Sequence, residues 1–317
     1  MTLRAVLRGA VTQFKRAGLT FGHGTHNARD EAVYLILHTL KLPLGELDPV
    51  LDRQLNPGEL DAVNAILQRR VQERTPAAYL TREAWLGAFR FYVDERAIVP
   101  RSFIAELLRD GLAPWVADGS RLGAMLDLCT GSGCLAVLAA HAFPNARIDA
   151  ADLSAEALQV ARRNVKDYAL GKRIRLIQTD LFDRLAARRY DVILSNPPYV
   201  NAAAMRALPR EYRREPRLAL AGGRDGLALV RRMLAQAADH LHTDGLLIVE
   251  IGHNRTTLEN AYPRLPFTWL ETSAGEDFVF MLRKEDLIGI SNNPNSVILS
   301  EAKNPLFRVS KKENSSA

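Results

Sequence analysis

Cysteine is scarce in this chain of 317 residues, which contains only Cys129 and Cys134. Both lie in one apolar, glycine-containing segment, and no further cysteine is present to complete a disulfide framework or a cysteine-rich metal site. We interpret both as reduced core thiols of a cytoplasmic protein. Hydrophobic runs of transmembrane length are also lacking, and the N-terminus has no signal-peptide core, so no membrane association is predicted.

Acidic residues are fewer than basic ones, and 36 Asp and Glu against 42 Lys and Arg give a net charge of +6. This excess favours an acidic or nucleic-acid partner, but it is small enough to serve solubility alone. Hydrophobic residues at 47% and charged residues at 25% are ordinary for a globular protein. The length allows one large domain or two smaller ones.

Residues 1–80 have the apolar spacing of helices and predict a small helical domain. Asn27 is expected to cap one helix, which Pro43 ends, and Asn56-Pro57-Gly58-Glu59 has the residues of a capping box that begins another. Three histidines occur here, His23, His26 and His38. No carboxylate or cysteine stands at a spacing that would complete a metal site with them.

Residues 81–100 change character, because aromatic and β-branched residues predict a hairpin with Asp94-Glu95-Arg96 at its turn. Pro100-Arg101-Ser102 is expected to begin a helix that runs through Leu108. We interpret this stretch as the connector between the helical domain and the remainder of the chain. Arg101 is expected to face either a ligand pocket or solvent.

From residue 121 onward strands alternate with helices, which predicts an α/β fold with a mostly parallel, doubly wound sheet. The expected strands cover residues 124–129, 147–151, 173–177, 190–194 and 246–250, with helices at 134–142, after Ser154 and at about 226–242, and a closing antiparallel hairpin at 267–271 and 277–281. After Leu287 the periodicity stops, so residues 288–317 are expected to form a disordered tail.

A glycine turn, Gly131-Ser132-Gly133, joins the first strand to its helix. Glycine permits a positive φ and lets a ligand approach the backbone closely. Residues 131–136 also satisfy the G-x-G-x-x-A dinucleotide pattern, which leaves NAD open as a ligand. Asp127 on the first strand argues against NAD, because its carboxylate repels a pyrophosphate and favours a ligand with cationic groups.

Acidic residues end the next two strands. Asp152, roughly 20 residues beyond the glycines, stands where a carboxylate accepts hydrogen bonds from ribose hydroxyls. Asp180 is placed to bind an adenine amino group, with Leu181 or Phe182 against the ring. Taken singly, each aspartate is better explained as a strand-end or helix-capping residue. Their occurrence at successive strand ends, with Asn196 at the fourth, predicts a nucleoside pocket.

The fourth strand leads into Asn196-Pro197-Pro198-Tyr199, where two prolines stop the strand because neither can donate a backbone hydrogen bond. The Asn196 side chain and the Pro197 carbonyl supply two acceptors for the hydrogens of a planar NH2 group, and Tyr199 offers a flat face to stack on it. The alternative is a turn that merely closes the strand, since Asn-Pro and Pro-Pro are common in turns.

The segments Asp127-Leu128-Cys129-Thr130-Gly131-Ser132-Gly133 and Asn196-Pro197-Pro198-Tyr199 resemble class I S-adenosylmethionine-dependent methyltransferases. Within these, the match is to the protein glutamine methyltransferases of the HemK/Prm group, and it covers nearly the whole chain to about Leu287. Three stretches, 91–102, 211–223 and 267–271, resemble the branch that acts on the third large-subunit ribosomal protein. One departure from that branch is Phe103, where a proline is expected.

The resemblance implies a Rossmann-like methyltransferase domain over residues 101–287, with residues 1–80 as a helical substrate-recognition domain and 81–100 as a hairpin connector. It also implies S-adenosylmethionine as cofactor, no metal, and methyl transfer to a glutamine of a ribosomal protein or a release factor. The implied cofactor-binding residues are Asp127, Thr130, Gly131, Ser132, Gly133, Asp152, Leu153, Asp180, Leu181 and Asn196. Asn196, Pro197 and Tyr199 are implied as catalytic, and together with Pro198 as substrate-binding.

Two other functions stay open. Adenine-N(6) methylation of DNA or RNA uses the same motif, because adenine also presents a planar NH2 group. No separate target-recognition domain or aromatic-rich basic stripe for a flipped base is found to support it. The second is a non-enzymatic assembly factor that contacts ribosomal RNA through a basic surface, and the intact acidic and amide residues argue against it.

Overall fold

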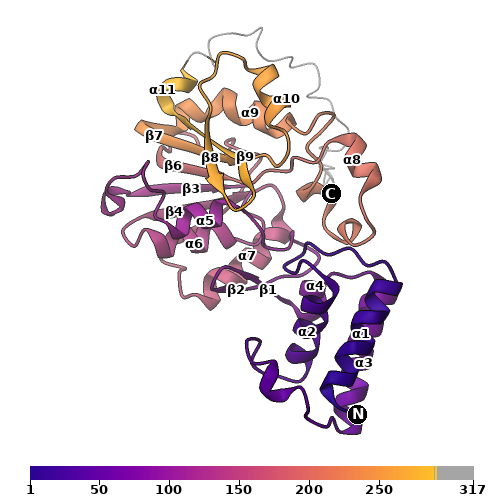
Figure 1. The fold of residues 1–317 in the computed structure, drawn as a ribbon. Helices are drawn as coiled ribbons and strands as arrows, with labels where there is room; N and C mark the ends of the chain where they lie inside the picture. The colour runs from indigo at the N-terminus through magenta and orange to yellow at the C-terminus, as the bar shows by residue number, and fades with distance from the viewer. Residues whose placement is uncertain (289, 291–317) are drawn as a thin grey trace, which may run out of the picture.

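The computed structural model describes residues 1–288 and residue 290 (Figure 1). Almost all of the tail that the sequence predicts to be disordered, 288–317, therefore lies outside the described residues. Figure 1 shows two lobes, with helices from the N-terminal part of the chain in one and the sheet with its flanking helices in the other.

The helical lobe is built from α1 (Leu3–Arg16), α2 (Ala28–Thr39), α3 (Pro57–Glu73) and α4 (Ala77–Thr81), with a short 3-10 helix at Asp48–Val50. Asn27 accepts hydrogen bonds from two backbone N–H groups of the first turn of α2, and Asn56 with Glu59 completes a capping box on α3, so both predicted helix starts are confirmed. Leu3, Phe14, Leu35 and Val63 pack in the lobe's own core.

The predicted hairpin forms, but its turn is elsewhere. Strands β1 (Glu83–Leu86) and β2 (Phe89–Tyr92) pair antiparallel and are joined at Gly87, whose φ is +59°. Residues 94–97 do form a turn, with Ala97 N–H donating to the Asp94 carbonyl, but it lies beyond β2, so the prediction that this turn joins the two strands is wrong. Glycine adopts this backbone conformation without a Cβ clash. Asp94 instead accepts hydrogen bonds from the Tyr92 hydroxyl and from Arg96 beyond the hairpin.

The α/β lobe contains one sheet of seven strands in the order β5-β4-β3-β6-β7-β9-β8. The strands are β3 (Ala124–Leu128), β4 (Arg147–Asp152), β5 (Ile174–Gln178), β6 (Tyr190–Ser195), β7 (Leu241–Glu250), β8 (Thr268–Thr272) and β9 (Gly275–Arg283). The first five are parallel, and β9 pairs antiparallel with β7 and β8. The predicted fold class is confirmed, including the closing hairpin.

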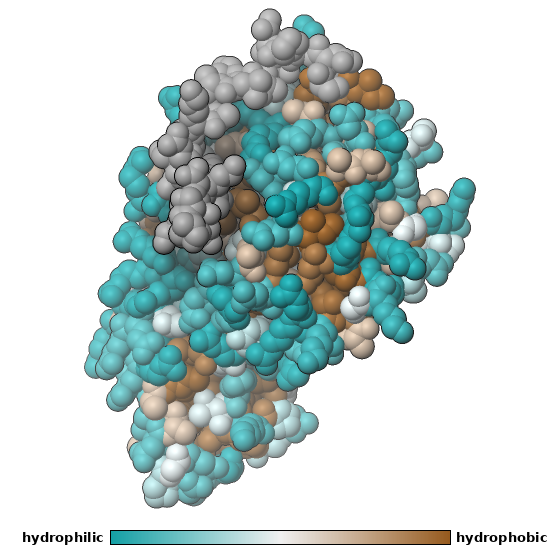
Figure 2. Space-filling view, turned by 180° about the vertical axis from the view of Figure 1, so that it is seen from behind, coloured by the Kyte–Doolittle hydropathy of each residue, from teal (hydrophilic) through white to brown (hydrophobic). Residues whose placement is uncertain are grey.

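Alternate residues along the strands point to opposite faces, and each face has its own helical layer. Met125, Ile148 and Val192 pack beneath α5 (Ile104–Arg109), α6 (Cys134–Ala142) and α7 (Ala155–Asp167). Leu126, Ile193 and Leu247 face α9 (Ala228–Gln236), α10 (Arg255–Ala261) and α11 (Lys284–Leu287). Figure 2 shows that hydrophobic side chains also gather at the surface of the α/β lobe, surrounded by hydrophilic ones.

One predicted element is shorter than expected. The helix expected at about 226–242 is divided into α9 and a 3-10 helix at Ala237–His240, and β7 begins at Leu241 instead of residue 246. Leu241 pairs with Tyr190 at the start of β6. This strand pairing overrides the helical pattern at residues 241–242, and local periodicity cannot predict it. The order of the strands reverses between β3 and β6, which is where open α/β sheets bind ligands.

Candidate active site

A cavity of about 280 Å³ lies at the carboxyl ends of β3, β4, β5 and β6. The predicted site residues on its wall are Gly131, Asp152, Leu153, Asp180, Leu181, Asn196, Pro197, Pro198 and Tyr199. Residues from four strand ends and from the proline turn therefore meet in one space. Cys129 packs against the core but also lines the cavity and is partly exposed, so its interpretation as a core thiol is only partly correct, whereas Cys134 is buried.

The glycine turn and Asp152 form one side of this cavity. The Asp152 carboxylate accepts hydrogen bonds from the backbone N–H of Gly131 (2.8 Å) and of Ser154 (2.8 Å), which fixes its position at the end of β4. Burial raises the pKa of Asp152, and these hydrogen bonds act in the opposite direction. Gly133 has a φ of +78°, and a Cβ there would lie 3.1 Å from Ala161, so the turn packs tightly on α7.

Asp127 lies behind the cavity wall, and so do Thr130, Ser132 and Gly133. The Asp127 carboxylate accepts hydrogen bonds from the Thr130 hydroxyl and from the backbone N–H of Ala136 (3.0 Å) in the first turn of α6. Burial raises its pKa to about 7. In the described structure Asp127 therefore ties the end of β3 to the glycine turn and the start of α6.

Asp180 and Leu181 complete this side from the loop after β5. Asp180 is partly exposed and forms an ion pair with Arg232 (3.0 Å). Leu181 is buried, with a positive φ of 47°. Leu153 and Leu229 add apolar surface to the same wall. The side is thus apolar with two carboxylates at its margin, which suits a flat heterocycle carrying hydroxyl groups.

The proline turn forms the opposite side. The Asn196 side-chain N–H donates to the backbone carbonyl of Arg101 (3.2 Å), an orientation that leaves its Oδ1 as an acceptor. Ser195, immediately before it, donates its hydroxyl to the Leu128 carbonyl (2.7 Å) and joins β6 to β3 at this point. Asn196 is therefore anchored from two sides and has one acceptor atom without a protein partner among the described residues.

Tyr199 is held by residues at the end of β7 and beyond it. Its hydroxyl lies 3.4 Å from Glu250, and Asn254 donates a side-chain N–H to its backbone carbonyl (2.9 Å). A Cβ at Gly252 would lie 2.7 Å from the Tyr199 ring, so only glycine permits this approach. Burial raises the pKa of Tyr199, which keeps the phenol neutral.

The helix-opening Pro100-Arg101-Ser102 segment adds residues to the site that the sequence left undecided. Arg101 lines the cavity and bonds to both carboxylate oxygens of the buried Glu215, at 2.6 and 2.7 Å. Burial disfavours the ionised Glu215, but attraction to Arg101 outweighs it and lowers the pKa to about 2. Phe103, where the resemblance predicts proline, donates its backbone N–H to Glu250 (2.9 Å), a bond that proline cannot make.

Residues 206–224, which we call the acceptor-side segment, cover the proline turn. Val200 and Ala221 form a parallel bridge, with Val200 N–H donating to Leu220 and Gly222 N–H donating back to Val200 (both 2.9 Å). A Cβ at Gly222 would lie 2.7 Å from the Tyr199 Cα. The sequence singled out this loop, but only the structure shows that it braces the turn.

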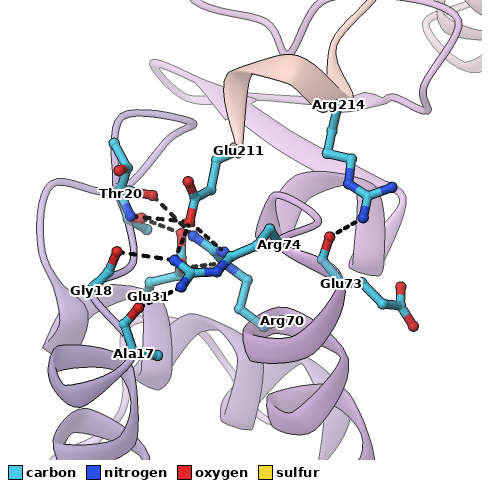
Figure 3. Close-up of polar contacts among 10 residues, drawn as sticks. Ala17, Gly18, Thr20, Glu31, Arg70, Glu73, Arg74, Glu211 and Arg214 are labelled. Carbon is cyan, nitrogen blue, oxygen red and sulfur yellow. Dashed lines mark hydrogen bonds and ion pairs between the residues drawn. The ribbon is translucent and has the colours of Figure 1, made fainter. Parts of the chain in front are cut away.

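The acceptor-side segment is also bonded to the helical lobe (Figure 3). Glu211 is buried and accepts hydrogen bonds from Thr20 N–H (3.2 Å) and from the Arg74 guanidinium (3.1 Å). Arg70 lies 3.6 Å from Glu211 and bonds to Glu31 at 2.6 Å. We call Glu31, Arg70, Arg74 and Glu211 the interdomain cluster. Arg214 adds a bond to the Glu73 carbonyl.

Comparison with known proteins agrees with this geometry. A methyltransferase small domain model matches residues 112–210. A ribosomal protein uL3 glutamine methyltransferase of Neisseria gonorrhoeae is 59% identical over 288 residues, covering 91% of this chain and 96% of that protein. The proteins of the same description from Burkholderia pseudomallei and Bordetella pertussis are each 56% identical, covering 92% and 90% of this chain and 97% and 96% of their own lengths.

Among solved structures, a methyltransferase from Pyrococcus furiosus has a TM-score of 0.45 and 19% identity, covering 63% of this chain and 90% of its own. A likeness this remote adds nothing on function. The sheet order and these relatives together define the chain as a class I methyltransferase. At the identity and coverage found with its relatives, it belongs to the family of ribosomal protein uL3 glutamine methyltransferases.

The sequence predicts neither a membrane span nor a metal site. Within the part of the chain that the structure describes, no helix is both long and apolar enough to cross a membrane. Over those same residues, no three His, Cys, Asp or Glu side chains gather closely enough to hold a metal ion. His23 is buried and contacts the ring of Tyr212 and the Glu215 carboxylate.

Proposed function

We propose that this methyltransferase transfers a methyl group from S-adenosylmethionine to the side-chain amide nitrogen of a glutamine in ribosomal protein uL3, in the cytoplasm. The single observation that supports this most is that Asn196 and its proline turn share one cavity with Asp152 and the glycine turn. The three relatives described above carry uL3 glutamine methylation in their names.

The residues present fit this cofactor. Asp152 is a partly buried carboxylate on the cavity wall whose oxygens suit the ribose hydroxyls, and Gly131 brings backbone close to the ligand. Leu153 and Leu181 suit the faces of the adenine, and Asp180 stands where its amino group would be bound. We assign Asp127, Thr130, Ser132 and Gly133 to shaping the turn, because they lie behind the wall. Bound there, the cofactor supplies an electrophilic methyl group on a positively charged sulfur.

The proline turn binds the glutamine side chain that accepts the methyl group. Asn196 Oδ1 and the Pro197 carbonyl accept the two hydrogens of the glutamine amide, and Tyr199 holds its plane. A carboxamide nitrogen is a poor nucleophile because its lone pair is delocalised, so fixing both hydrogens aims that lone pair at the methyl carbon. Held in this way, the cofactor would supply the methyl group, and the amide nitrogen would release one proton to solvent as it gains that group. The nitrogen becomes acidic as it is alkylated, so no general base is required.

The helical lobe is proposed to help recognise the substrate protein. This role is supported by the interdomain cluster, which fixes the lobe to the acceptor-side segment (Figure 3). That segment covers the proline turn. A protein docked on the lobe would thus be held at a constant distance from Asn196. Contact with ribosomal RNA beside the substrate belongs to the same proposal.

The test is methylation of purified acceptors. The full chain is incubated with S-adenosylmethionine and, in separate reactions, with uL3, a release factor and an adenine-containing RNA. We expect uL3 alone to gain the mass of one methyl group, and peptide mapping to locate it on a glutamine. Methylation of the release factor alone would assign the chain to the other substrate, and methylation of the RNA would overturn the proposal.

A further inference from the structure

In the acceptor-side segment, the positively charged side chains are exposed and the negatively charged ones are buried. All six of its arginines are exposed, namely Arg206, Arg210, Arg213, Arg214, Arg217 and Arg224. Its two acidic residues, Glu211 and Glu215, are buried, with 1% and 4% of their surface exposed. The segment contains no lysine and no aspartate. An ordinary solvated surface mixes both signs of charge, so this separation calls for an external partner.

The two buried carboxylates are already paired with arginines that lie outside the segment. Glu211 bonds to Arg74 of the helical lobe, and Glu215 bonds to Arg101 at the cavity. None of the six exposed guanidinium groups forms an ion pair with a carboxylate of residues 1–288 or 290. Arg213 and Arg214 donate hydrogen bonds to backbone carbonyls, and Arg214 is also attracted to the nearby Glu73 carboxylate. The outer face of the segment is therefore strongly positive.

A groove of about 710 Å³ runs along this face. Four of the arginines line it, Arg206, Arg213, Arg217 and Arg224, over a floor that includes Met205, Leu208, Leu218 and Leu220. Leu208, Tyr212, Leu218 and Leu220 also line the active-site cavity, so the two spaces adjoin. Whatever occupies the groove lies beside the acceptor glutamine.

We infer that this groove binds a single-stranded RNA segment next to the acceptor glutamine. Guanidinium forks match the geometry of phosphate oxygens, and arginine planes with an apolar floor receive unstacked bases. An acidic polypeptide also complements the charge, but it would need carboxylates at the spacing of four arginines, whereas RNA carries a phosphate at every nucleotide. The inference rests on the proposed function in one respect, that a ribosomal substrate is presented together with RNA.

The direct test is RNA binding by the full chain, measured by fluorescence anisotropy with a labelled single-stranded oligonucleotide over a range of salt concentrations. The triple variant R206Q/R217Q/R224Q is expected to bind about tenfold more weakly or worse, and the slope of log K against log salt should fall in magnitude by about 2, since each lost phosphate contact contributes about 0.7. The matched control R147Q/R162Q/R264Q removes three exposed arginines of the α/β lobe that do not line the groove and should retain the wild-type slope.

Activity then separates RNA from polypeptide. The ratio of methylation rates on RNA-bound and free uL3 should fall about tenfold in the groove variant, because only the first substrate loses a contact. An equal loss on both substrates with unchanged RNA affinity would show that the groove binds polypeptide and would overturn the inference. So would a wild-type chain without measurable RNA affinity. If instead RNA binding depends on the groove but uL3 is not methylated, the proposed function fails while the inference stands.

Discussion

The two sides of the cavity hold their carboxylates in different ways. On the cofactor side, Asp127 and Asp152 are surrounded by hydroxyl and backbone N–H donors. On the acceptor side, Glu211 and Glu215 bond to arginines. Each side has one exception, because Asp180 pairs with Arg232 on the first side and Glu250 bonds to Ser102 and Phe103 on the second. Burial raises the pKa of Asp127 to about 7, whereas Arg101, against the opposing effect of burial, holds that of Glu215 at about 2.

This difference separates binding from architecture. A carboxylate that is on a cavity wall without a countercharge keeps its hydrogen-bonding capacity for a ligand, as we propose for Asp152. Glu211 and Glu215, which are already paired with arginines, stabilise the fold and need not lie next to the reacting groups. Substitutions can therefore affect each side separately. We expect the largest loss of methylation rate where the substrate amide is proposed to bind.

Substituting Asn196 by Ala should have the largest effect, and only on the acceptor side. The amide loses one of its two proposed acceptors, so we expect the methylation rate at saturating cofactor to fall by about 100-fold or more. Cofactor affinity, measured by isothermal titration calorimetry, should stay within a few-fold of the wild type. A collapse of cofactor affinity with normal turnover would mean that the two sides have been assigned the wrong way round.

Substituting Glu211 by Gln should destabilise the fold by about 3 kcal/mol, because the guanidinium groups of the buried Arg70 and the partly buried Arg74 lose this countercharge. Urea unfolding monitored by circular dichroism gives this free energy. The matched control is Asp52→Asn, which removes an exposed pair with Arg4 and should leave stability nearly unchanged. Equal stability of both variants would refute the role given to the interdomain cluster.

Substituting Asp152 by Asn tests the cofactor side. Loss of a charged acceptor typically costs about 2 kcal/mol, so cofactor affinity should fall about 30-fold, and methylation should recover largely when cofactor is raised to saturation. Leu153→Ala, on the same wall, changes apolar contact without removing charge and serves as a comparison. If saturating cofactor does not restore the rate, Asp152 acts in the chemical step and our division of roles is wrong.

The smallest effects are expected from pH. Asp127 has a pKa raised from 3.8 to about 7, so the folded state holds a proton that the unfolded state releases, and stability should decline as pH rises through this interval. Glu215 has a pKa lowered from 4.5 to about 2, so its contribution is present above 4.5 and is lost as pH falls toward 2.

The first of these declines, between the unfolded-state and folded-state pKa values of Asp127, is the one to test. Urea unfolding curves at a series of pH values measure it. Asp127→Asn should flatten this decline in stability. It should leave unchanged the loss of stability at low pH that is assigned to Glu215. A variant that kept the wild-type slope between the two pKa values would show that another group titrates there.

The sequence predicted several of the residues that share the cavity on the proposed cofactor side, because they follow local rules. Gly131 and Asp152 stand at the ends of strands that hydrophobic periodicity identifies, and parallel strands bring their ends together. Asn196 was reached by the same reasoning. Asp127 was correctly placed near the glycine turn, but burial behind the wall depends on how α6 packs, which a one-dimensional pattern does not contain.

The acceptor side depends on partners far apart in the chain, so sequence patterns could not assemble it. Glu211 bonds to Thr20 and Glu215 to Arg101, across 191 and 114 residues. No periodicity links such positions. The misplaced hairpin turn has a different cause: residues 94–97 do turn, but Gly87, which adopts a positive φ, is the residue that joins the two strands.

The turn that begins at Asn196 is completed by chain on both sides of it. Arg101 comes long before it, Leu220 shortly after, and Asn254 later still. During synthesis, β3, β4 and the glycine turn emerge early, whereas the last brace of Tyr199 is made only when Asn254 has left the ribosome. We therefore expect a nascent or truncated chain to hold its methyl donor before it is able to use it, so that catalytic competence reports the completed fold.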